Sequence, residues 1–564
     1  MPRFTAQELD AHRAKVTQLL DKPSIKVGMS TCGVAAGAVL AFDTLVEEAK
    51  SKSANILISR TGCAGMCSME PLVEVCIPGQ PAAMYGNVDA ELARRIINEH
   101  VLSSQPIVER LVPSIEALAV AYDKSDTPTP PGASGPRQYR IVLRNCGVID
   151  PESIDEYIAR EGYQALQKAL SGMTSDQIIE ELKVSGLRGR GGAGFPTWHK
   201  WQLTRDAQGD EHYIICNGDE GDPGAYMDRS VLEGDPHSII EGMIIGGYVI
   251  GARQGVFYIR AEYPLAVQRI EKAIRQACAV GLLGKNILGT EFSFDLEIRL
   301  GAGAFVCGEE TALIASVEGK RGTPRPRPPF PSVKGLWNMP TMINNVETLA
   351  NIAPILVRGG KWFGSIGIGK STGTKVFAVT GKIKNSGLVE IPMGTTLREV
   401  VNGICGGIAS GRRVKAVQTG GPSGGLIPEQ HLGTPVSYEH LQALGSIMGS
   451  GGMIVMDDTD SVVELSRFYL GFCVDESCGK CAPCRIGGTQ ILRTLNRIAD
   501  LKGTERDIAT VRRIAHAMQK ASLCGLGQTA PNPILSALRY FEPEFMERIA
   551  AAKTARKEPG IARK

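Results

Sequence analysis

The sequence predicts an α/β multidomain protein with a helical C-terminal domain. Its 564 residues suffice for roughly three or four domains with sizeable cores. Apolar runs typical of buried strands alternate with amphipathic helical segments along most of the chain, whereas helical patterns dominate near the C-terminus. We predict domains at 1–124, 138–373, 374–457 and 458–552, a linker at 125–137 and a basic tail at 553–564.

Composition and charge exclude several functions. The formal net charge of +3 gives no support for nucleic-acid binding. Met1–Leu20 mixes charged and apolar residues, unlike a signal peptide. The longest apolar-leaning segment, Ile239–Ala252, contains four glycines and is too short to cross a bilayer. We therefore expect a cytoplasmic protein without direct membrane insertion.

The first domain has the pattern of a small α/β fold. Its predicted elements are helices at Ala6–Leu20, Ala35–Lys50 and Asp89–His100, and strands at Ile25–Gly28, Asn55–Ser59, Leu72–Ile77 and Ala83–Tyr85. Asp126–Arg137 is rich in proline, glycine and serine, as is typical of a linker. Arg140–Leu143 then predicts the first strand of the next domain.

A glycine loop (Gly186–Gly194) follows a predicted helix that begins at Thr174 or Ser175. Five of its nine residues are glycine, and glycine lets backbone N–H groups approach an anion closely. Two cations, Arg190 and Lys200, are expected to add charge-assisted contacts to a phosphate. The candidate loop residues are Gly189, Arg190, Gly191, Gly192, Gly194, Phe195 and Lys200.

An acidic turn (Asn217–Asp222) follows the predicted buried strand Tyr213–Cys216. Ligands of α/β folds bind at the carboxyl ends of strands, so Asn217, Asp219, Glu220 and Asp222 are candidate ligand contacts. The spacing is not the GxGxxG fingerprint, and a Rossmann fold is not predicted from it. A mobile surface loop is the alternative for either segment alone, but together they favour a nucleotide site.

A second glycine turn (Gly301–Glu310) opens another predicted helix. Backbone amides at such a position suit phosphate or flavin oxygens. Glu309 and Glu310 have a simpler explanation as well, because carboxylates at a helix start complement its dipole.

Cysteines cluster near the C-terminus. Cys478, Cys481 and Cys484 form C-x2-C-x2-C, and Cys524 follows after 39 intervening residues. Three thiolates on one loop and a distant fourth suit a [4Fe-4S] cluster. An all-cysteine zinc site is the alternative, although zinc sites prefer two separated pairs.

Together these motifs resemble the flavin- and NADH-binding subunit of respiratory complex I and the diaphorase subunits of NAD(P)-linked hydrogenases and formate dehydrogenases. The resemblance covers about Arg137–Glu547. It implies that FMN lies on the glycine loop, the acidic turn and the second glycine turn, with NAD(H) stacked near Phe195. Hydride would pass from NADH to FMN, and single electrons would continue to the [4Fe-4S] cluster.

The resemblance also assigns single residues and one further domain. Residues 374–457 look like the family's ubiquitin-like β-grasp domain, and the family's contacts to FMN or NADH correspond to Phe305, Gly308, Glu309, Glu310, Arg327, Phe330, Asn344, Asn345 and Thr348.

The N-terminal domain resembles the thioredoxin-like [2Fe-2S] ferredoxins. Cys32 follows the first predicted strand, and Cys63 and Cys67 form C-x3-C after the second. The family's second cysteine is replaced by Gly37, which leaves three thiolates for a cluster that needs four ligands. Cys76 is either the fourth ligand or an ordinary buried cysteine of a strand. A dithiol redox role for Cys63 and Cys67 is less favoured, because the spacing is not C-x-x-C.

Departures from the complex I pattern indicate the hydrogenase or electron-bifurcating type. They are Asp222 for glutamate, Leu203 for an aromatic residue, Phe305 for tyrosine and Arg327 for lysine. The extra C-terminal ferredoxin domain common in bifurcating subunits does not follow, which argues against bifurcation. Asp222 is predicted to face the nucleotide ribose and to favour NADH over NADPH by a reduced margin.

The implied partners are a small thioredoxin-like [2Fe-2S] subunit and a larger iron–sulfur catalytic subunit of a hydrogenase, formate dehydrogenase or other reductase. Three alternatives stay open from the sequence: a complex I subunit, a free-standing NAD(P)H diaphorase and an inactive electron-relay scaffold.

Overall fold

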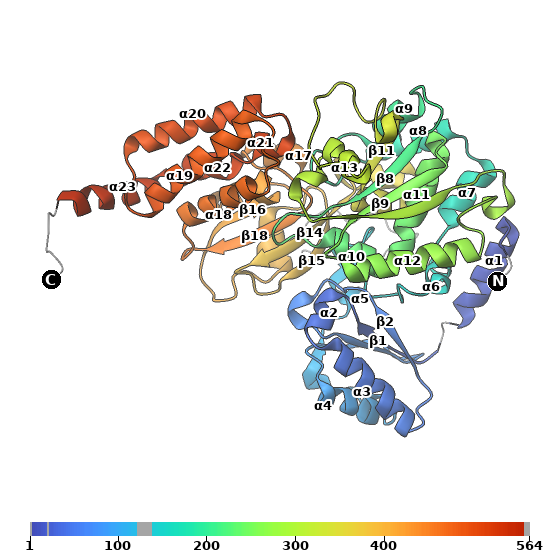
Figure 1. Ribbon diagram of the computed structural model, residues 1–564. Coiled ribbons are helices and arrows are strands. Elements are labelled where there is room, and N and C mark those ends of the chain that lie inside the picture. The colour runs from blue at the N-terminus through green and yellow to red at the C-terminus, as the bar shows by residue number, and fades with distance from the viewer. Residues whose placement is uncertain (1–2, 20–21, 121–137, 558–564) are drawn as a thin grey trace.

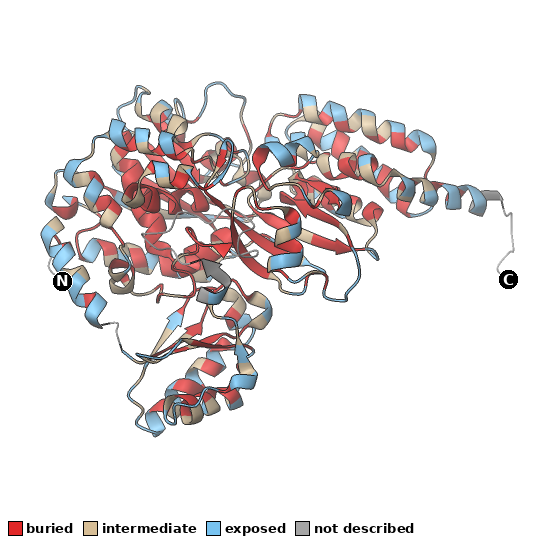
Figure 2. Ribbon diagram, turned by 180° about the vertical axis from the view of Figure 1, so that it is seen from behind, coloured by how far each residue is buried: buried red, intermediate tan, exposed pale blue. Residues whose placement is uncertain are grey.

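The structure is a computed structural model that describes residues 3–19, 22–120 and 138–557 (Figure 1). The predicted linker at 125–137 lies outside the described residues. Three sheets of four or five strands and a C-terminal group of helices form the body of the described chain, with two further two-stranded sheets. Figure 2 shows the buried residues gathered around the two larger central sheets, with exposed residues on the outer helices. No helix in the described part of the chain is long and apolar enough to span a bilayer.

The N-terminal sheet has the order β2-β1-β3-β4-β5, in which only the β1–β2 pair is parallel. Its elements are β1 (Ser24–Gly28), α2 (Thr31–Ala35), α3 (Ala38–Ser51), β2 (Leu57–Thr61), β3 (Val73–Cys76), β4 (Ala83–Tyr85), α4 (Ala90–Arg95) with a π-helical extension to Val101, and β5 (Leu111–Val112). They agree closely with the elements predicted from the sequence.

Helix α1 (Ala6–Leu19) does not pack on this sheet. Phe4, Leu9 and Val16 are buried in the core of the central region, and His12 lies 2.8 Å from Asp155 on α6 (Ile154–Ala159). The segment predicted as domain 1–124 is therefore divided, because the apolar face of α1 packs on the central region and not on the N-terminal sheet (Figure 1).

The central region contains a four-stranded parallel sheet of order β10-β9-β8-β11. Helix α11 (Pro236–Ile250) is buried along nearly its whole length, which agrees with its mostly apolar sequence. After α6 the elements are α7 (Gln164–Gly172), α8 (Ser175–Ser185), α9 (Thr197–Arg205), β8 (Tyr213–Gly218), α10 (Met227–Gly234), α11 (Pro236–Ile250), β9 (Gln254–Arg260), α12 (Pro264–Ala279), β10 (Asp295–Gly301), α13 (Glu310–Val317), β11 (Thr341–Asn345), α14 (Val346–Ala350), α15 (Ile352–Arg358) and α16 (Gly360–Gly364).

Helix α8 begins and ends as its sequence predicts. Thr174 and Gln177 form a reciprocal capping box, and Gly186 closes the helix in the left-handed region with φ 65°. The helix therefore delivers the glycine loop directly from its C-terminus.

The predicted strand at Arg140–Leu143 is wrong. The N–H groups of Ile141, Val142 and Leu143 all donate to the carboxylate of Glu390, at 2.9, 3.0 and 2.9 Å. A buried side chain thus satisfies backbone donors that a sheet would otherwise have paired, and this short apolar run adopts turns.

A second, mixed sheet of order β15-β14-β18-β16-β17 follows. Lys375 and Glu347 form a fully buried ion pair that joins this sheet to the central region. The elements are the hairpin β12 (Gly367–Ile368) and β13 (Ser371–Thr372), then β14 (Thr374–Gly381), β15 (Gly387–Pro392), β16 (Val414–Thr419), β17 (Gly425–Pro428), α17 (Tyr438–Ala443) and β18 (Gly452–Asp457).

The C-terminal region is helical, in agreement with its sequence. Part of the predicted tail belongs to the last helix, and residues 558–564 lie outside the described chain. The helices are α18 (Val462–Asp475), α19 (Gly488–Ala499), α20 (Glu505–Ala521), α21 (Gly525–Thr529), α22 (Asn532–Tyr540) and α23 (Glu542–Lys557).

Candidate functional site

The carboxyl ends of the parallel strands gather the predicted flavin-site segments. β8 ends in the acidic turn, β10 ends in the second glycine turn, and β11 ends at Asn345, which is the register partner of Asn217. The Asn217 Nδ2 donates to the Gly308 carbonyl at 3.0 Å and so joins the acidic turn to the second glycine turn. Segments far apart in the sequence therefore meet at one edge of the sheet.

The glycine loop lies against the same edge. A Cβ added at Gly191 would lie 3.0 Å from the Cβ of Asn345, and one at Gly194 would lie 2.6 Å from the Tyr438 ring. Gly192 and Gly194 adopt φ values of 131° and 64°, which favour glycine. The loop backbone is thus exposed at Gly191, while Asn345 and Tyr438 pack closely against the loop.

Arg190 has a different role from the predicted phosphate contact. Its side chain is buried, and its guanidinium donates to the carbonyl oxygens of Thr374, Thr372 and Arg188 at 3.0, 2.7 and 3.0 Å. These hydrogen bonds use the donors of the guanidinium group and hold the glycine loop against β13 and β14. The local sequence could not reveal them, because Thr372 and Thr374 lie far along the chain.

Lys200 points back into the site. Its ammonium group contacts the carboxylate of Glu310 and donates to the Ile343 carbonyl at 3.1 Å. Glu309 caps α13, accepting from the N–H groups of Thr311 and Ala312 at 3.0 Å each. The capping role considered from the sequence is therefore present for Glu309, whereas Glu310 faces a cation.

Asp219 provides the strongest sign of ligand binding in the acidic turn. Its side chain is only 1% exposed, and neither carboxylate oxygen has a hydrogen-bond partner in the structure. Arg260 Nε lies 3.9 Å away. Burial raises the pKa of Asp219 to about 7. An orphaned buried carboxylate is costly, and a ligand that presents hydroxyl groups would satisfy it.

Glu220 and Asp222 are held by the protein itself. Glu220 is buried and accepts from the N–H groups of Asp228 and Arg229 at 3.0 Å each, which caps the start of α10. Asp222 Oδ2 accepts from the Ser450 hydroxyl at 2.7 Å, and its carboxylate lies against Gly421. Burial raises the pKa of Asp222 to about 6, and the Ser450 hydrogen bond opposes this rise. The carboxylate predicted to face a ribose is thus engaged with the second sheet domain.

The polar residues at the end of β11 and in the following helix α14 also hold the scaffold. Asn344 Oδ1 accepts from Trp201 Nε1 at 2.9 Å, and Asn345 Nδ2 donates to Asp228 at 2.6 Å. The Thr348 hydroxyl accepts from the Arg190 N–H at 2.8 Å. These three predicted residues lie at the site, and their recorded partners are protein groups.

Aromatic side chains remain available at the rim. Phe195 is 44% exposed and Phe330 is 53% exposed. Arg327 lies over the Phe330 ring at 5.9 Å and within 4.0 Å of both Glu309 and Glu310. Two exposed rings and a cation beside paired carboxylates form a surface suited to a planar, charged ligand.

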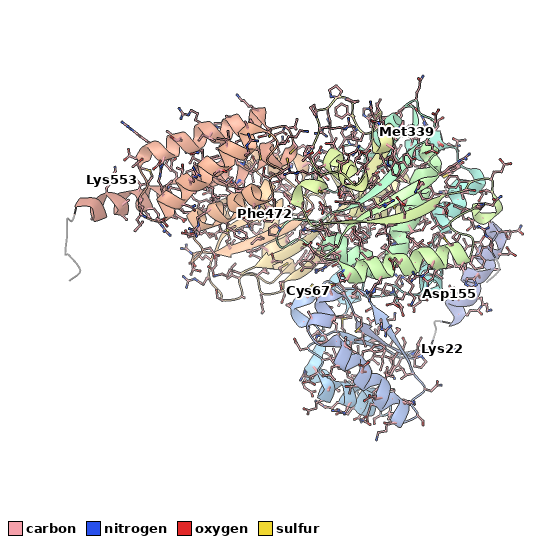
Figure 3. All side chains as sticks on the ribbon, in the orientation of Figure 1. Lys22, Cys67, Asp155, Met339, Phe472 and Lys553 are labelled. Carbon is pink, nitrogen blue, oxygen red and sulfur yellow. The ribbon has the colours of Figure 1, made fainter. Side chains whose placement is uncertain are left out.

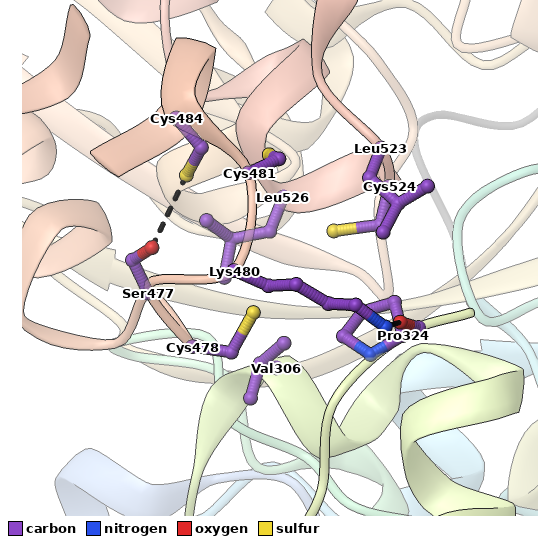
Figure 4. Close-up of a pocket in the computed structure, with 10 residues that line it drawn as sticks. All are labelled: Val306, Pro324, Ser477, Cys478, Lys480, Cys481, Cys484, Leu523, Cys524 and Leu526. Atoms are coloured by element: carbon purple, nitrogen blue, oxygen red, sulfur yellow. Dashed lines mark hydrogen bonds between the residues drawn. The ribbon is translucent and has the colours of Figure 1, made fainter. Parts of the chain in front are cut away.

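The C-terminal cysteines surround one small cavity. Its lining includes Val306, Pro324 and the four cysteines Cys478, Cys481, Cys484 and Cys524, and we call it the four-cysteine cavity. Figure 4 shows the four sulfur atoms around a common space, with the Cys484 thiol 3.2 Å from the Ser477 hydroxyl. Four thiols converging in a largely apolar enclosure fit a cubane iron–sulfur cluster.

The four-cysteine cavity adjoins the second glycine turn. Val306 of this turn lines the cavity, and the N–H of Phe305 donates to Glu476 at 2.7 Å, two residues before Cys478. The Phe305 ring also packs edge-to-face on Phe472 at 5.4 Å. The turn that faces Asn217 on one side therefore contacts the cysteine loop on the other.

The N-terminal cysteines form a second group, the three-cysteine site (Cys32, Cys63 and Cys67). The Cys63 and Cys67 sulfur atoms are 3.7 Å apart. The Tyr226 hydroxyl donates to the Cys67 sulfur at 3.5 Å, and Arg229 Nη2 donates to the Cys32 sulfur at 3.7 Å. Figure 3 shows Cys67 where the N-terminal domain meets the rest of the molecule.

Cys76 does not join the three-cysteine site. It pairs with Ser24 at the start of β1, whereas Cys32 follows the end of that strand. Cys76 instead lines a separate cavity with Lys22 and Lys26. The sequence analysis did not identify Tyr226 and Arg229, because no local motif marks them. They reach the thiols because the start of α10, which follows the acidic turn, packs against the N-terminal domain.

Three family models match the chain. The Nuo51 FMN-binding domain matches residues 182–354, the SLBB domain matches 376–427, and the NADH-ubiquinone oxidoreductase-F iron-sulfur binding region matches 464–548. These matches confirm that the chain contains the predicted FMN-binding and [4Fe-4S]-binding regions. The SLBB match lies within the second sheet domain.

Individual relatives agree with these matches. The NADP-reducing hydrogenase subunit HndC of Solidesulfovibrio fructosivorans is 56% identical over 409 residues, which are 72% of this chain and 83% of the relative. An NADH-quinone oxidoreductase subunit of Rhizobium meliloti is 45% identical over 409 residues, which are 72% of this chain and 97% of the relative. A crystal structure of an NAD+-reducing [NiFe]-hydrogenase in the H2-reduced state aligns with TM-score 0.64 and 28% identity, covering 99% of this chain and 94% of that chain.

Proposed function

Because this chain belongs to the family of FMN-binding subunits that includes HndC and its counterparts in NADH-quinone oxidoreductases, we propose that it is the electron-entry subunit of a multisubunit oxidoreductase of the hydrogenase type. It oxidises NADH and delivers electrons through an iron–sulfur cluster to a partner subunit. The one observation that carries this function is the second glycine turn, which contacts Asn217 through Gly308 and lines the four-cysteine cavity through Val306.

The residues at the sheet edge fit FMN. Gly189–Gly194 offers a close backbone approach for the phosphate, and the orphaned Asp219 carboxylate offers an acceptor for hydroxyl groups of the flavin side chain. When bound, FMN supplies the chemistry that accepts a hydride from a nicotinamide and releases its two electrons singly. The role of this chain is to position the reactants and exclude water, and no side-chain acid or base is needed.

The exposed rim fits the nicotinamide nucleotide. Phe195 and Phe330 offer stacking faces, and Arg327 offers a bidentate donor for the diphosphate. We propose NADH as the preferred nucleotide, with NADPH as a weaker substrate. The Asp222–Ser450 hydrogen bond supports only a small contribution of Asp222 to this preference.

The outlet for electrons is the four-cysteine cavity, whose thiols hold a [4Fe-4S] cluster. Lys480 donates to the Pro324 carbonyl at 2.6 Å and ties the cysteine loop to the proline-rich segment after α13. Phe305 and Glu476 hold this loop directly against the second glycine turn. The turn on which FMN would lie therefore contacts the loop whose thiols would hold the cluster.

We further propose that the N-terminal domain is a thioredoxin-like ferredoxin with a [2Fe-2S] cluster at the three-cysteine site. Its mixed sheet and the contacts of the Cys67 thiol with the thiols of both Cys63 and Cys32 support this assignment. The proposed partners are a small thioredoxin-like [2Fe-2S] subunit and a larger iron–sulfur catalytic subunit. The coverage of nearly the whole chain by a hydrogenase structure favours a hydrogenase partner over a complex I membrane arm.

Purification under anaerobic conditions tests the function. We expect yellow protein with about one FMN per chain, bleached by NADH, and NADH-dependent reduction of an artificial dye. Absence of flavin, or flavin that NADH does not bleach, would leave only a relay scaffold. Purification of the native complex separates a subunit from a lone diaphorase, since a free-standing enzyme would carry no iron–sulfur partner.

A further inference from the structure

The three-cysteine site is one protein ligand short of a [2Fe-2S] cluster, and this inference rests on the proposed cluster there. Cys63 and Cys67 lie close together and suit one iron, whereas Cys32 comes from α2, the short helix after β1. Gly37, where related ferredoxins have a cysteine, is exposed, and a Cβ there would meet no atom within 4 Å. Position 37 therefore points to open space and not into the site.

Glu70 is a buried carboxylate beside α2, the helix that carries Cys32. It lies three residues after Cys67 and is only 7% exposed. Its Oε2 accepts from the Leu72 N–H at 3.0 Å, while Oε1 is buried without a hydrogen-bond partner. The carboxylate packs against α2, the helix that carries Cys32: a Cβ added at Gly33 would lie 3.2 Å from Glu70 Oε2.

We propose that Glu70 is the fourth protein ligand of the N-terminal cluster. Cys32 and Glu70 would hold one iron, and Cys63 and Cys67 would hold the other. A carboxylate carries the same single negative charge as the thiolate it replaces, so the total charge of the cluster is unchanged. Replacement of both cysteines on one iron by another ligand type is known chemistry for [2Fe-2S] centres.

Cys76 and Glu233 are less suited than Glu70 to be the fourth ligand. Cys76 is half-buried and lies at the far end of β1, beside Ser24. Glu233 also lies near Cys32, but its carboxylate already accepts from the Thr31 N–H and hydroxyl, whereas Glu70 Oε1 has no hydrogen-bond partner.

The flavin domain completes the surroundings of the site. Arg229 and Tyr226 direct hydrogen-bond donors to Cys32 and Cys67, and Arg229 adds a positive charge beside four anionic ligands. The Thr31 N–H donates to Glu233 at 2.8 Å and fixes the turn that presents Cys32. Hydrogen bonds of this kind orient ligands and tune a metal centre.

Iron content and EPR spectra of the anaerobically purified full chain test the proposal, with variants Glu70→Ala and Glu70→Cys and the control Cys76→Ser. We expect about six irons per chain in the wild type, four from one cluster and two from the other. Glu70→Ala should lose about two irons and the [2Fe-2S] EPR signal. Glu70→Cys should keep both irons but show a changed EPR spectrum, because a fourth thiolate replaces an oxygen ligand. Cys76→Ser should match the wild type.

Several outcomes would overturn the assignment. Full iron with an unchanged spectrum in Glu70→Ala, or a spectrum unchanged in Glu70→Cys, shows that Glu70 is not a ligand. Loss of the signal in Cys76→Ser shows that the fourth ligand is elsewhere. Should Glu70→Ala fail to fold, Glu70→Cys decides alone. A wild-type chain with about four irons refutes the N-terminal cluster, yet NADH bleaching of its FMN would leave the proposed function intact.

Discussion

The two cysteine sites differ in how much of each lies within a single segment. In the four-cysteine cavity, Cys478, Cys481 and Cys484 come from one loop, and only Cys524 arrives from elsewhere. The three-cysteine site takes Cys32 from α2 and Cys63 and Cys67 from the segment after β2, and two of its hydrogen-bond donors come from the flavin domain. A site built within a loop can be recognised from spacing, whereas a site shared between domains cannot.

The two sites also contact different turns of the flavin region. The cavity adjoins the second glycine turn through Phe305 and Val306, and the three-cysteine site adjoins the residues after the acidic turn through Tyr226 and Arg229. We expect variants on one side to leave the other side intact, and the following experiments test this independence.

The largest effect is expected for Cys481→Ser. Loss of a cluster ligand should remove about four irons per chain and abolish electron transfer to the native partner. NADH-to-dye activity should persist, because reduction of the flavin precedes the cluster. Cys473→Ser is the matched control, since Cys473 is buried outside the cavity with its thiol 3.8 Å from the Pro422 carbonyl. Unchanged iron in Cys481→Ser would refute the cluster assignment.

The variant Gly191→Val should expel the flavin and leave both iron sites loaded. A side chain at Gly191 meets Asn345 at 3.0 Å and covers the exposed backbone of the loop. We expect FMN content to fall well below one per chain. Gly172→Val is the control, because a Cβ there meets no atom within 4 Å. Iron lost together with FMN would mean that the two cysteine sites depend on the flavin.

Asp219 predicts a pH dependence of FMN binding. Burial raises its pKa from 3.8 to about 7, so the folded apoprotein holds this proton more tightly than the unfolded chain. The contribution of Asp219 to apoprotein stability therefore falls as pH rises from about 4 to about 7. If flavin hydroxyls donate to the carboxylate, FMN binding releases the proton, and affinity should rise about tenfold per pH unit up to about pH 7.

Fluorescence titration of the apoprotein with FMN between pH 5.5 and 8.5, a range chosen to bracket a pKa of about 7, measures this slope. Asp219→Asn should remove the slope, because the amide does not titrate. A variant that keeps the wild-type slope would assign the titration to another group.

Arg229→Met should affect only the N-terminal side. The substitution removes a positive charge and a donor beside Cys32, which makes reduction of a cluster there less favourable. We expect its potential to fall by about 60 mV, a tenfold change for a one-electron couple. Redox titration followed by EPR measures the shift, with the exposed Arg299→Met as control. A matching change in the [4Fe-4S] potential would contradict the separation of the two sites.

The smallest effect is expected for Asp222→Ala. Its carboxylate is directed to Ser450, so removing it should raise the NADPH to NADH ratio of kcat/KM by roughly threefold, less than about 1 kcal/mol. Ser450→Ala tests the same contact from the other side. An increase in Asp222→Ala far above this estimate would mean that the carboxylate faces the ribose during turnover.

The sequence by itself determined the features that lie within short segments. The C-x2-C-x2-C spacing, the glycine loop after α8 and the acidic turn after β8 each combine a local conformation with suitable side chains, and neighbouring residues decide that conformation. For the same reason the strands β1 to β4, the start of α8 and the strand β8 agree with the predictions within a few residues.

Only the tertiary structure decided which charged side chains of these segments are engaged by other parts of the protein and which are left to bind a ligand. Arg190 and Asp222 carry suitable charges, but residues 182 and 228 positions away occupy them. The apolar run at 141–143 became a turn because Glu390 satisfies its N–H groups, and α1 left its predicted domain because its apolar face is covered elsewhere. Hydrogen bonding and burial between distant segments depend on packing, and no spacing within the sequence encodes them locally.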